Sequence, residues 1–296
     1  MKTAPSSRAR LSILFSMLIW GSIGLFRRFI PLPSASLAAV RALGGVACLM
    51  AWTFLRRQPI AFSALRKNAL ALLLSGAFIG ANWILLFEAY RYTSVAVATL
   101  CYYMAPMIVM LLSPFMLHER LTKKKLLCLA ASLLGMTMVS GVLCSNDGNS
   151  LRGVLLGLAA AMFYASVILT NKRISGISSM DRTVAQLSVA AVVAIPYALL
   201  TEDLSAVTLN PNSIIMLLIV MIVHTGLAYA LYFSSMDLLP AQTAALMSYI
   251  DPISAILLSA LVLKEGMNLL SIVGTVLVLS SVICCELPEK KSARTN

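Results

Sequence analysis

Apolar stretches of about 20 residues recur along the whole chain, and short polar connections separate them. A helix of about 20 residues is long enough to cross the hydrocarbon core of a bilayer. The pattern predicts ten membrane-spanning helices, at about 11–30, 34–55, 68–90, 94–117, 125–144, 152–171, 182–201, 212–233, 240–263 and 268–286. The connections are too short to hold a soluble domain, and the most turn-prone one, residues 145–150, separates two sets of five predicted helices.

The second half of the chain repeats part of the first. When residues 80–119 are laid over 226–265 without a gap, 12 of 40 positions are identical. The identities include the pairs Pro106/Pro252 and Glu119/Glu265. Internal repeats in a membrane protein are typical of transporters whose binding site lies where the repeats meet.

The number of helices in each repeat determines how the repeats are related. We predict a first repeat at 1–146 and a second at 147–296. Because each holds five helices, an odd number, the second enters the membrane in the opposite sense. A pseudo-two-fold axis in the membrane plane then relates the two. The predicted fold is an all-α integral membrane protein with ten transmembrane helices, arranged as two inverted five-helix repeats around a central cavity.

Composition and charge agree with this membrane fold. The chain is 60% hydrophobic and 11% charged, whereas soluble domains carry roughly 25% charged residues. If the N-terminus is cytoplasmic, 17 of the 23 Lys and Arg residues fall in cytoplasmic segments. This positive-inside pattern places both termini in the cytoplasm, and we expect a bacterial inner-membrane protein. No small-residue cleavage site follows the first apolar stretch, so we expect the first helix to be retained rather than cleaved. The net charge of +12 is therefore no sign of nucleic-acid binding.

Four short motifs resemble those of a known family. They are Trp20–Gly21–Ser22, Val40–Arg41–Ala42, Ala89–Tyr90–Arg91–Tyr92–Thr93–Ser94, and the paired stretches that contain Pro106 and Glu119 or Pro252 and Glu265. Together they resemble the EamA-type branch of the drug/metabolite transporter superfamily, over essentially the whole chain. The resemblance implies a bundle of two inverted repeats with a central cavity. The second half departs from the pattern because it has Gln186 near the place that corresponds to Arg41.

Asp251 is the strongest candidate for a functional side chain. It lies near the middle of the predicted helix 240–263 and precedes Pro252. A charged Asp at that depth costs about 2.5–3.5 kcal/mol, so it is expected to face a cavity. Pro252 removes a backbone donor and is expected to free the Ser248 carbonyl. The alternative is a structural Asp that caps a kink by hydrogen bonding to Ser248 or Tyr249.

Other candidates lie within the predicted helices. Tyr102, Tyr103, Tyr249 and Ser248 flank the two prolines and are candidate substrate contacts. Trp83 could wall the cavity or simply pack in the bundle. Arg41 could bind a substrate anion or pair with Glu88 across the bundle.

Two further groups could titrate during transport. Glu88 could face the cavity or pair with Arg91 three residues later. Glu88, Asp251 and His224 are the candidate proton-coupling groups, although a lone His on an apolar helix is also typical of a core residue. Glu119 and Glu265 end their helices and oppose the helix dipole, so we expect each to bind the N-terminus of the following helix. With Pro106 and Pro252 they form a predicted set of hinges.

These features favour a secondary active transporter. We expect it to export a small metabolite such as an amino acid, by alternating access, and an organic cation or drug is the alternative substrate class.

The sequence lacks a phosphate-binding loop of the GxxxxGK kind, so we expect no ATPase. His118–Glu119 lacks the second His of a zinc protease, and the six Cys have no metal-ligand spacing. A membrane-embedded enzyme and a channel are the other classes considered. We expect no cofactor and no metal, and the partners that we expect are a small-molecule substrate and the lipid bilayer. A monomer is the simplest oligomeric state consistent with the sequence.

Overall fold

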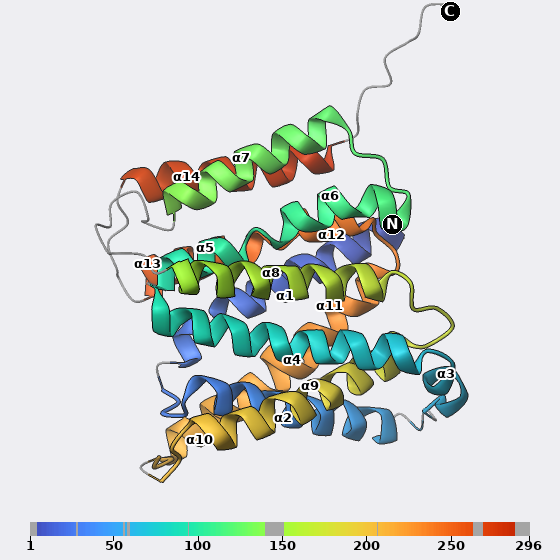
Figure 1. Cartoon of the computed structure of the whole chain (residues 1–296), viewed down its shortest axis with the longest axis vertical. Helices are drawn as coiled ribbons and strands as arrows, with labels where there is room; N and C mark the ends of the chain where they lie inside the picture. Colours follow the sequence, from blue (N-terminus) through green and yellow to red (C-terminus); the bar gives the residue numbers. More distant parts are fainter. Residues whose placement is uncertain are drawn as a thin grey trace, which may run out of the picture.

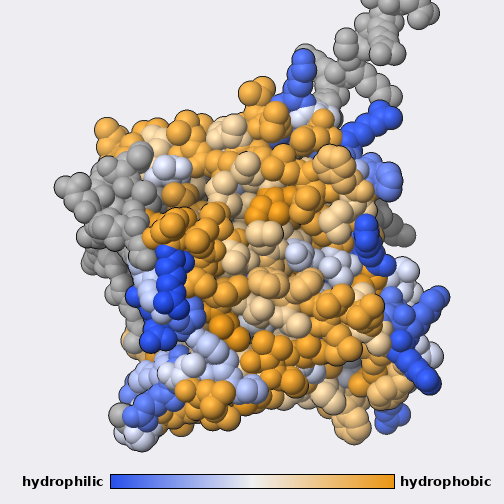
Figure 2. Space-filling model, viewed as in Figure 1, coloured by the Kyte–Doolittle hydropathy of each residue, from blue (hydrophilic) through white to orange (hydrophobic). Residues whose placement is uncertain are grey.

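The structure is a computed structural model that describes residues 5–27, 29–55, 57, 60–93, 95–139, 151–205, 207–262 and 269–287. Its helices lie side by side with their axes roughly along one direction, so that the connections gather at two ends (Figure 1). A broad apolar belt covers the face between these ends, and hydrophilic side chains cluster at the ends themselves (Figure 2). This distribution is the one that a bilayer requires of a spanning bundle.

The bundle consists of helices joined by short connections. In chain order they are α1 (Pro5–Arg27), α2 (Ser34–Leu55), α3 (Phe62–Lys67), α4 (Ala69–Tyr92), α5 (Val95–Tyr102), α6 (Ala105–Leu117), α7 (Lys123–Val139), α8 (Leu151–Asn171), α9 (Ser179–Thr201), α10 (Pro211–Ile219), the π-helix η2 (Val220–Leu227), α11 (Ala228–Met236), α12 (Ala241–Met247), α13 (Ile250–Val262) and α14 (Leu269–Glu286). Among the described residues, seven helical stretches are long and apolar enough to cross a membrane.

Two predicted helices are broken near their middles. The stretch 94–117 consists of α5 and α6, and the stretch 240–263 consists of α12 and α13. Pro106 lies in the first turn of α6, and Pro252 in the first turn of α13. A proline is tolerated there because the first turn of a helix does not use its backbone donors. The breaks that the paired prolines predicted are therefore present, as interruptions between two short helices.

The packing places helices from both halves of the chain around one centre. Helix α4 packs against α8 and α9, α2 against α9 and η2, and α1 against α13 and α11. Helices α5 and α6 pack on α8, and α12 packs on α6. Helices α7 and α14 form a separate pair at one edge, at the top of Figure 1, joined by a 2.5 Å hydrogen bond between the hydroxyls of Ser132 and Ser281.

The two ends of the bundle differ in charge. Basic side chains concentrate at the end where α4 begins and α6 and α8 end, and we call it the basic end. It carries Arg66, Lys67, Arg120, Lys123, Lys124, Lys125, Lys172 and Arg173. At the opposite end, which we call the far end, the described basic residues are Arg27, Arg91 and Arg152. The asymmetry matches the charge pattern from which the cytoplasmic side was predicted.

Candidate functional site

A cavity of about 490 Å³ lies at the centre of the bundle. Helices α1, α2, α4, α5 and α6 line it from one half of the chain, and α8, α11 and α13 from the other. Aromatic side chains form a large part of its wall: Trp20, Trp83, Phe87, Tyr90, Tyr102, Tyr103, Tyr164 and Tyr229. A volume of this size suits a small organic molecule.

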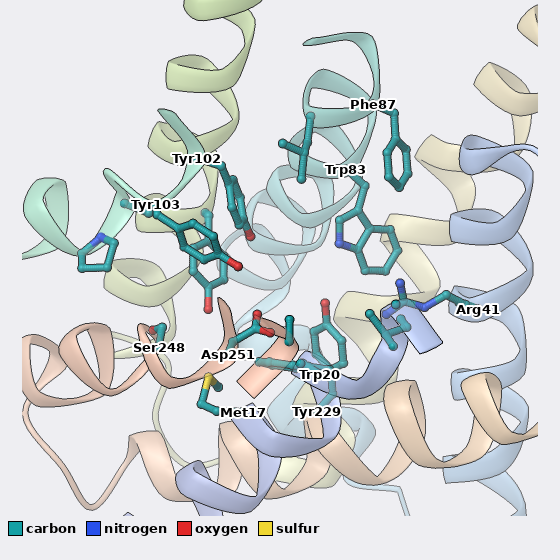
Figure 3. A pocket seen from close by; sticks show the side chains of 18 of the residues that line it. Met17, Trp20, Arg41, Trp83, Phe87, Tyr102, Tyr103, Tyr229, Ser248 and Asp251 are labelled. Atoms are coloured by element: carbon teal, nitrogen blue, oxygen red, sulfur yellow. The ribbon is translucent and has the colours of Figure 1, made fainter. Parts of the chain in front are cut away.

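Asp251 supplies the acid of this cavity. It lies in the first turn of α13, immediately after the helix break, and its carboxylate points into the cavity in Figure 3. The positive end of the α13 dipole favours a negative charge at this position. Gly21 allows α1 to approach closely, since a Cβ on Gly21 would lie 2.6 Å from the Asp251 carbonyl oxygen. The Trp20–Gly21 pair therefore brings α1 up to the acid.

The alternative role for Asp251, as a cap on a kink, has no hydrogen bond to support it, because among the described residues the Asp251 side chain forms none with Ser248 or Tyr249. The Ser248 hydroxyl donates to the Ala244 carbonyl at 3.1 Å, and the Tyr249 hydroxyl donates to the Tyr103 carbonyl at 3.0 Å. The Ser248 carbonyl accepts a hydrogen bond from the Asp251 N–H at 3.2 Å, so the prediction that Pro252 frees this carbonyl was wrong. The neighbouring N–H takes the place of the one that proline lacks.

Arg41 supplies the positive charge of the cavity, on the side away from Asp251 (Figure 3). Its guanidinium carbon lies 5.7 Å from the centre of the Trp83 ring, a cation–π arrangement. Its Nε donates to the Thr225 hydroxyl at 3.3 Å. In the described parts of the chain, no carboxylate forms an ion pair with Arg41, and no cation forms one with Asp251. The cavity thus presents a carboxylate and a guanidinium on separate walls.

Glu88 belongs to a different hollow. Its carboxylate pairs with Arg91 at 3.0 Å, as the spacing predicted, and also accepts a hydrogen bond from the Tyr197 hydroxyl. The predicted pair between Arg41 and Glu88 was therefore wrong. Glu88 lines a hollow of about 290 Å³ at the far end, which shares Phe87 and Tyr90 with the central cavity. The central cavity accordingly continues toward the far end.

The far end also holds a carboxylate cap that the sequence did not suggest. Glu202 accepts hydrogen bonds from the N–H groups of Ala35 and Ser36, at 2.8 and 2.6 Å, and from the Ser36 hydroxyl at 2.6 Å. These are the unsatisfied donors at the N-terminus of α2. Glu202 lies at the end of α9, so it joins two helices that are distant in the sequence.

Glu119 makes an equivalent cap at the basic end. Its carboxylate accepts hydrogen bonds from the N–H groups of Ala241 at 2.6 Å and Gln242 at 3.2 Å, which begin α12. The prediction that Glu119 binds the following helix, α7, was wrong in its partner. The α7 N-terminus is capped by Thr122 instead, whose hydroxyl accepts a hydrogen bond from the Lys125 N–H at 3.3 Å. Glu265 lies outside the described residues.

Further charged side chains hold the connection between α11 and α12. Arg182 bonds to both oxygens of Asp237, at 2.9 and 3.1 Å, and to the Phe233 carbonyl at 2.7 Å. The Lys172 ammonium donates to the carbonyls of Met236 and Leu239. Burial lowers the pKa of Lys172 from its ordinary value, and the carboxylates of Glu119 and Asp237 partly offset this shift.

We call Glu119, Lys172 and Arg182, together with residues 236–242 that they hold, the basic-end lock. A buried Arg bound to both a carboxylate and a carbonyl is costly to separate from its partners. The lock therefore ties the ends of α6 and α8 and the start of α9 to the connection between α11 and α12, at the end opposite to the far-end hollow.

Two predicted site residues lie behind the cavity wall. His224 is buried in η2, where its Nε2 lies 2.9 Å from the Ser22 hydroxyl and its ring packs against Phe26. Tyr249 is also fully buried, with its hydroxyl on the Tyr103 carbonyl. By contrast Arg41, Trp83, Tyr102, Tyr103, Ser248, Asp251 and Pro106 line the cavity.

The aromatic side chains of the wall that sequence reasoning did not single out include Trp20, Tyr90 and Tyr164. Trp20 could have been found from Gly21 beside it, because a glycine inside an apolar helix often marks a close approach. No local pattern distinguishes Tyr164 from an ordinary core residue. Among the described residues there is no group of His, Cys, Asp or Glu that could hold a metal ion.

Comparisons with known proteins match both halves of the chain. A model of the EamA-like transporter family matches residues 7–141 and again residues 151–285. The chain is 29% identical over 284 residues to the "Uncharacterized transporter YxxF" of Bacillus subtilis (strain 168), covering 93% of this chain and 88% of that protein. It is 25% identical over 182 residues to the "Probable amino-acid metabolite efflux pump" of Salmonella typhimurium (strain LT2), covering 58% and 61%.

A solved crystal structure shares the fold. It superposes with a TM-score of 0.84 at 19% identity, over 95% of this chain and 96% of the other. The family model covers most of the chain in two stretches, and the long apolar helices agree with it. The chain therefore belongs to the EamA-like transporter family, and it is a multi-pass membrane transporter.

Proposed function

We propose that the protein is a secondary active transporter that exports an amino acid or a related amphipathic solute across the bacterial inner membrane by alternating access. The observation that carries this proposal is the central cavity, where Asp251 and Arg41 lie on separate walls with no ion pair among the described residues. A zwitterion could place its amine toward Asp251 and its carboxylate toward Arg41. The aromatic side chains between them would contact its apolar part.

Alternating access in our proposal rests on two inverted five-helix repeats, 1–146 and 147–296, with ten transmembrane helices in total. Two observations support this arrangement. The family model matches twice over stretches of equal length. Tyr103 and Tyr249, which correspond at an offset of 146 residues, lie at the two helix breaks and contact each other through a hydrogen bond. Two interrupted helices that meet at the centre are typical of transporter binding sites.

The direction of opening also supports this mechanism. The cavity continues toward the far end through the second hollow, while the basic-end lock closes the other end. If the basic end is cytoplasmic, as the charge distribution favours, this conformation faces outward. Inward opening would then require residues 236–242 to separate from Glu119, Lys172 and Arg182. Both termini would lie in the cytoplasm.

Export is the direction that we propose, and one relative supports it. The similarity to a protein named as an amino-acid metabolite efflux pump favours both this direction and this substrate class. An organic cation is the second candidate, favoured by the aromatic side chains around Asp251. The two candidates differ in whether the solute needs a carboxylate for Arg41.

Counterflow into proteoliposomes tests the proposal. Purified full-length protein is reconstituted, and uptake of radiolabelled L-phenylalanine is compared with uptake of phenethylamine, its decarboxylated analogue. Saturable counterflow of the amino acid, lost in Arg41→Gln, supports the zwitterion. Counterflow of the amine alone, unaffected by Arg41→Gln, supports the organic cation. Counterflow of neither, in a panel extended to the other amino acids, contradicts the proposed substrate class.

A further inference from the structure

One stretch of the membrane-spanning helices is a π-helix, and it lies directly behind the cavity. The span Pro211–Met236 changes from α-helix to the π-helix η2 over Val220–Leu227 and back again. A π-helix is rare and is found frequently at functional sites. Its presence next to a binding cavity therefore calls for a physical reason.

The unusual register of η2 aims two polar groups at the cavity wall. The Thr225 hydroxyl donates to the carbonyl five residues earlier, Val220, at 3.1 Å. Since its single proton is used there, its lone pairs remain as acceptors, and the Nε of Arg41 donates to them at 3.3 Å. The His224 carbonyl, in the same π-helix, accepts a hydrogen bond from the indole of Trp20 at 2.8 Å. Both Arg41 and Trp20 line the cavity.

Two glycines in α2 make this contact possible. Gly45 lies one turn after Arg41 and so on the same face of α2. A Cβ on Gly45 would lie 2.7 Å from the Thr225 methyl carbon, and one on Gly44 would lie within 2.7 Å of three atoms of Met221. Without these glycines α2 could not approach η2 closely enough for Arg41 to reach Thr225.

The contacts orient the Arg41 guanidinium but leave its two terminal amino groups without a hydrogen-bond partner among the described residues. Thr225 holds Nε, and Trp83 lies 5.7 Å from the guanidinium carbon. In the described part of the chain, Arg41 forms no other hydrogen bond and no ion pair. The two terminal amino groups of a guanidinium so held can receive a carboxylate with both of its oxygens.

We propose that Thr225 is a positioning residue: through η2 it fixes the Arg41 guanidinium at the cavity wall and so sets the preference for solutes that carry a carboxylate. The proposal rests on the transport function proposed above. It goes beyond that function by assigning carboxylate selectivity to a buried residue that does not touch the solute.

Two substitutions separate the hydroxyl from the packing of Thr225. Thr225→Val keeps the branched shape against Gly45 and removes the hydroxyl, whereas Thr225→Ser keeps the hydroxyl and removes the methyl group. The hydrogen bond is tested without any solute, by the hydrogen-exchange rate of the Arg41 Nε–H in ¹⁵N-arginine NMR of the full-length protein in nanodiscs. The Arg41 signal is assigned by its loss in Arg41→Lys.

We expect slow exchange in the wild type and in Thr225→Ser, and exchange at least about tenfold faster in Thr225→Val, because a hydrogen bond to a charged donor is lost. In proteoliposomes we expect Thr225→Val to raise the KM for L-phenylalanine about tenfold while the KM for phenethylamine stays within about twofold. Thr225→Ser should behave as the wild type does with both solutes.

Equal Nε–H exchange in the three proteins would overturn the proposal. So would an equal rise of KM for both solutes in Thr225→Val, or a defect in Thr225→Ser as large as that in Thr225→Val, since either would indicate packing rather than positioning. If the wild type transports neither solute, the proposed substrate class fails. The exchange rates then decide separately whether Thr225 positions Arg41.

Discussion

Replacing Glu119 with Gln should open the basic end of the bundle. The carboxylate now accepts the N–H groups of Ala241 and Gln242, at 2.6 and 3.2 Å, and so attaches the end of α6 to the start of α12. The amide of Gln keeps one oxygen acceptor but has no charge. It therefore loses one of the two bonds, the charge assistance of the other, and the attraction to the α12 dipole.

The size of the effect follows from these losses. Hydrogen bonds to a charged group contribute about 1.5–3 kcal/mol each, roughly twice the value for neutral groups. We take about 2 kcal/mol as the loss for Glu119→Gln, after allowing for the partial exposure of the site. Since each 1.4 kcal/mol is a factor of about ten, the population open at the basic end should rise about 10- to 50-fold.

Cysteine accessibility measures this opening. Ser248 lines the cavity, so Ser248→Cys is introduced into a variant from which the six native cysteines have been removed. A membrane-impermeant thiosulfonate is added from the basic side, using vesicles of the required orientation. In Glu119→Gln the labelling rate should rise at least about tenfold.

Glu202→Gln is the matched control. It removes the same kind of cap, on the N–H groups of Ala35 and Ser36, but at the far end. It should leave labelling from the basic side unchanged. An unchanged rate in Glu119→Gln, or the same increase in both variants, would refute the claim that Glu119 closes this end.

Three further predictions concern the site, the hinges and the topology. Asp251→Asn should abolish counterflow while the protein still inserts at normal levels, because the amide cannot supply the cavity's negative charge; flux equal to the wild type would contradict this role. Pro106→Ala and Pro252→Ala should slow flux and change cysteine accessibility at the two ends in opposite directions, because the repeats are proposed to be inverted; changes in the same direction would make the breaks static features of shape. A reporter fused at Asn296 should be cytoplasmic and one inserted at Asn210 periplasmic, since the basic connections favour the inner side; a cytoplasmic signal at Asn210 would overturn the inverted arrangement.

The sequence predicted the features that depend on local pattern. Apolar length located the seven long apolar helical stretches of the described residues, and the paired prolines located the two helix breaks. The isolated acid Asp251 was correctly expected in a cavity, because an unpaired charge at that depth is too costly to face lipid. The Glu88–Arg91 pair followed from the spacing of three residues along one helix.

The features that sequence reasoning missed depend on contacts between distant segments. Glu119 lies 122 residues before Ala241, and Glu202 lies 166 residues after Ser36. Spacing along one helix indicates which neighbours share a face, but not which helix end approaches another. The π-helix was missed for a related reason, because the side chains that bond to it, Arg41 and Trp20, come from other helices. Gly44–Gly45 was the one local sign of the close approach.

A single cavity that opens alternately to the two sides should show coupled changes in accessibility at its two ends. Single cysteines at Tyr90, on the far-end side of the cavity, and at Gln242, in the basic-end lock, are labelled with and without saturating transported solute. Alternating access predicts that the solute changes the two labelling rates in opposite directions, and that Glu119→Gln raises the rate at Gln242 while lowering it at Tyr90. Rates that rise together at both positions, as in an open pore, would rule out alternating access.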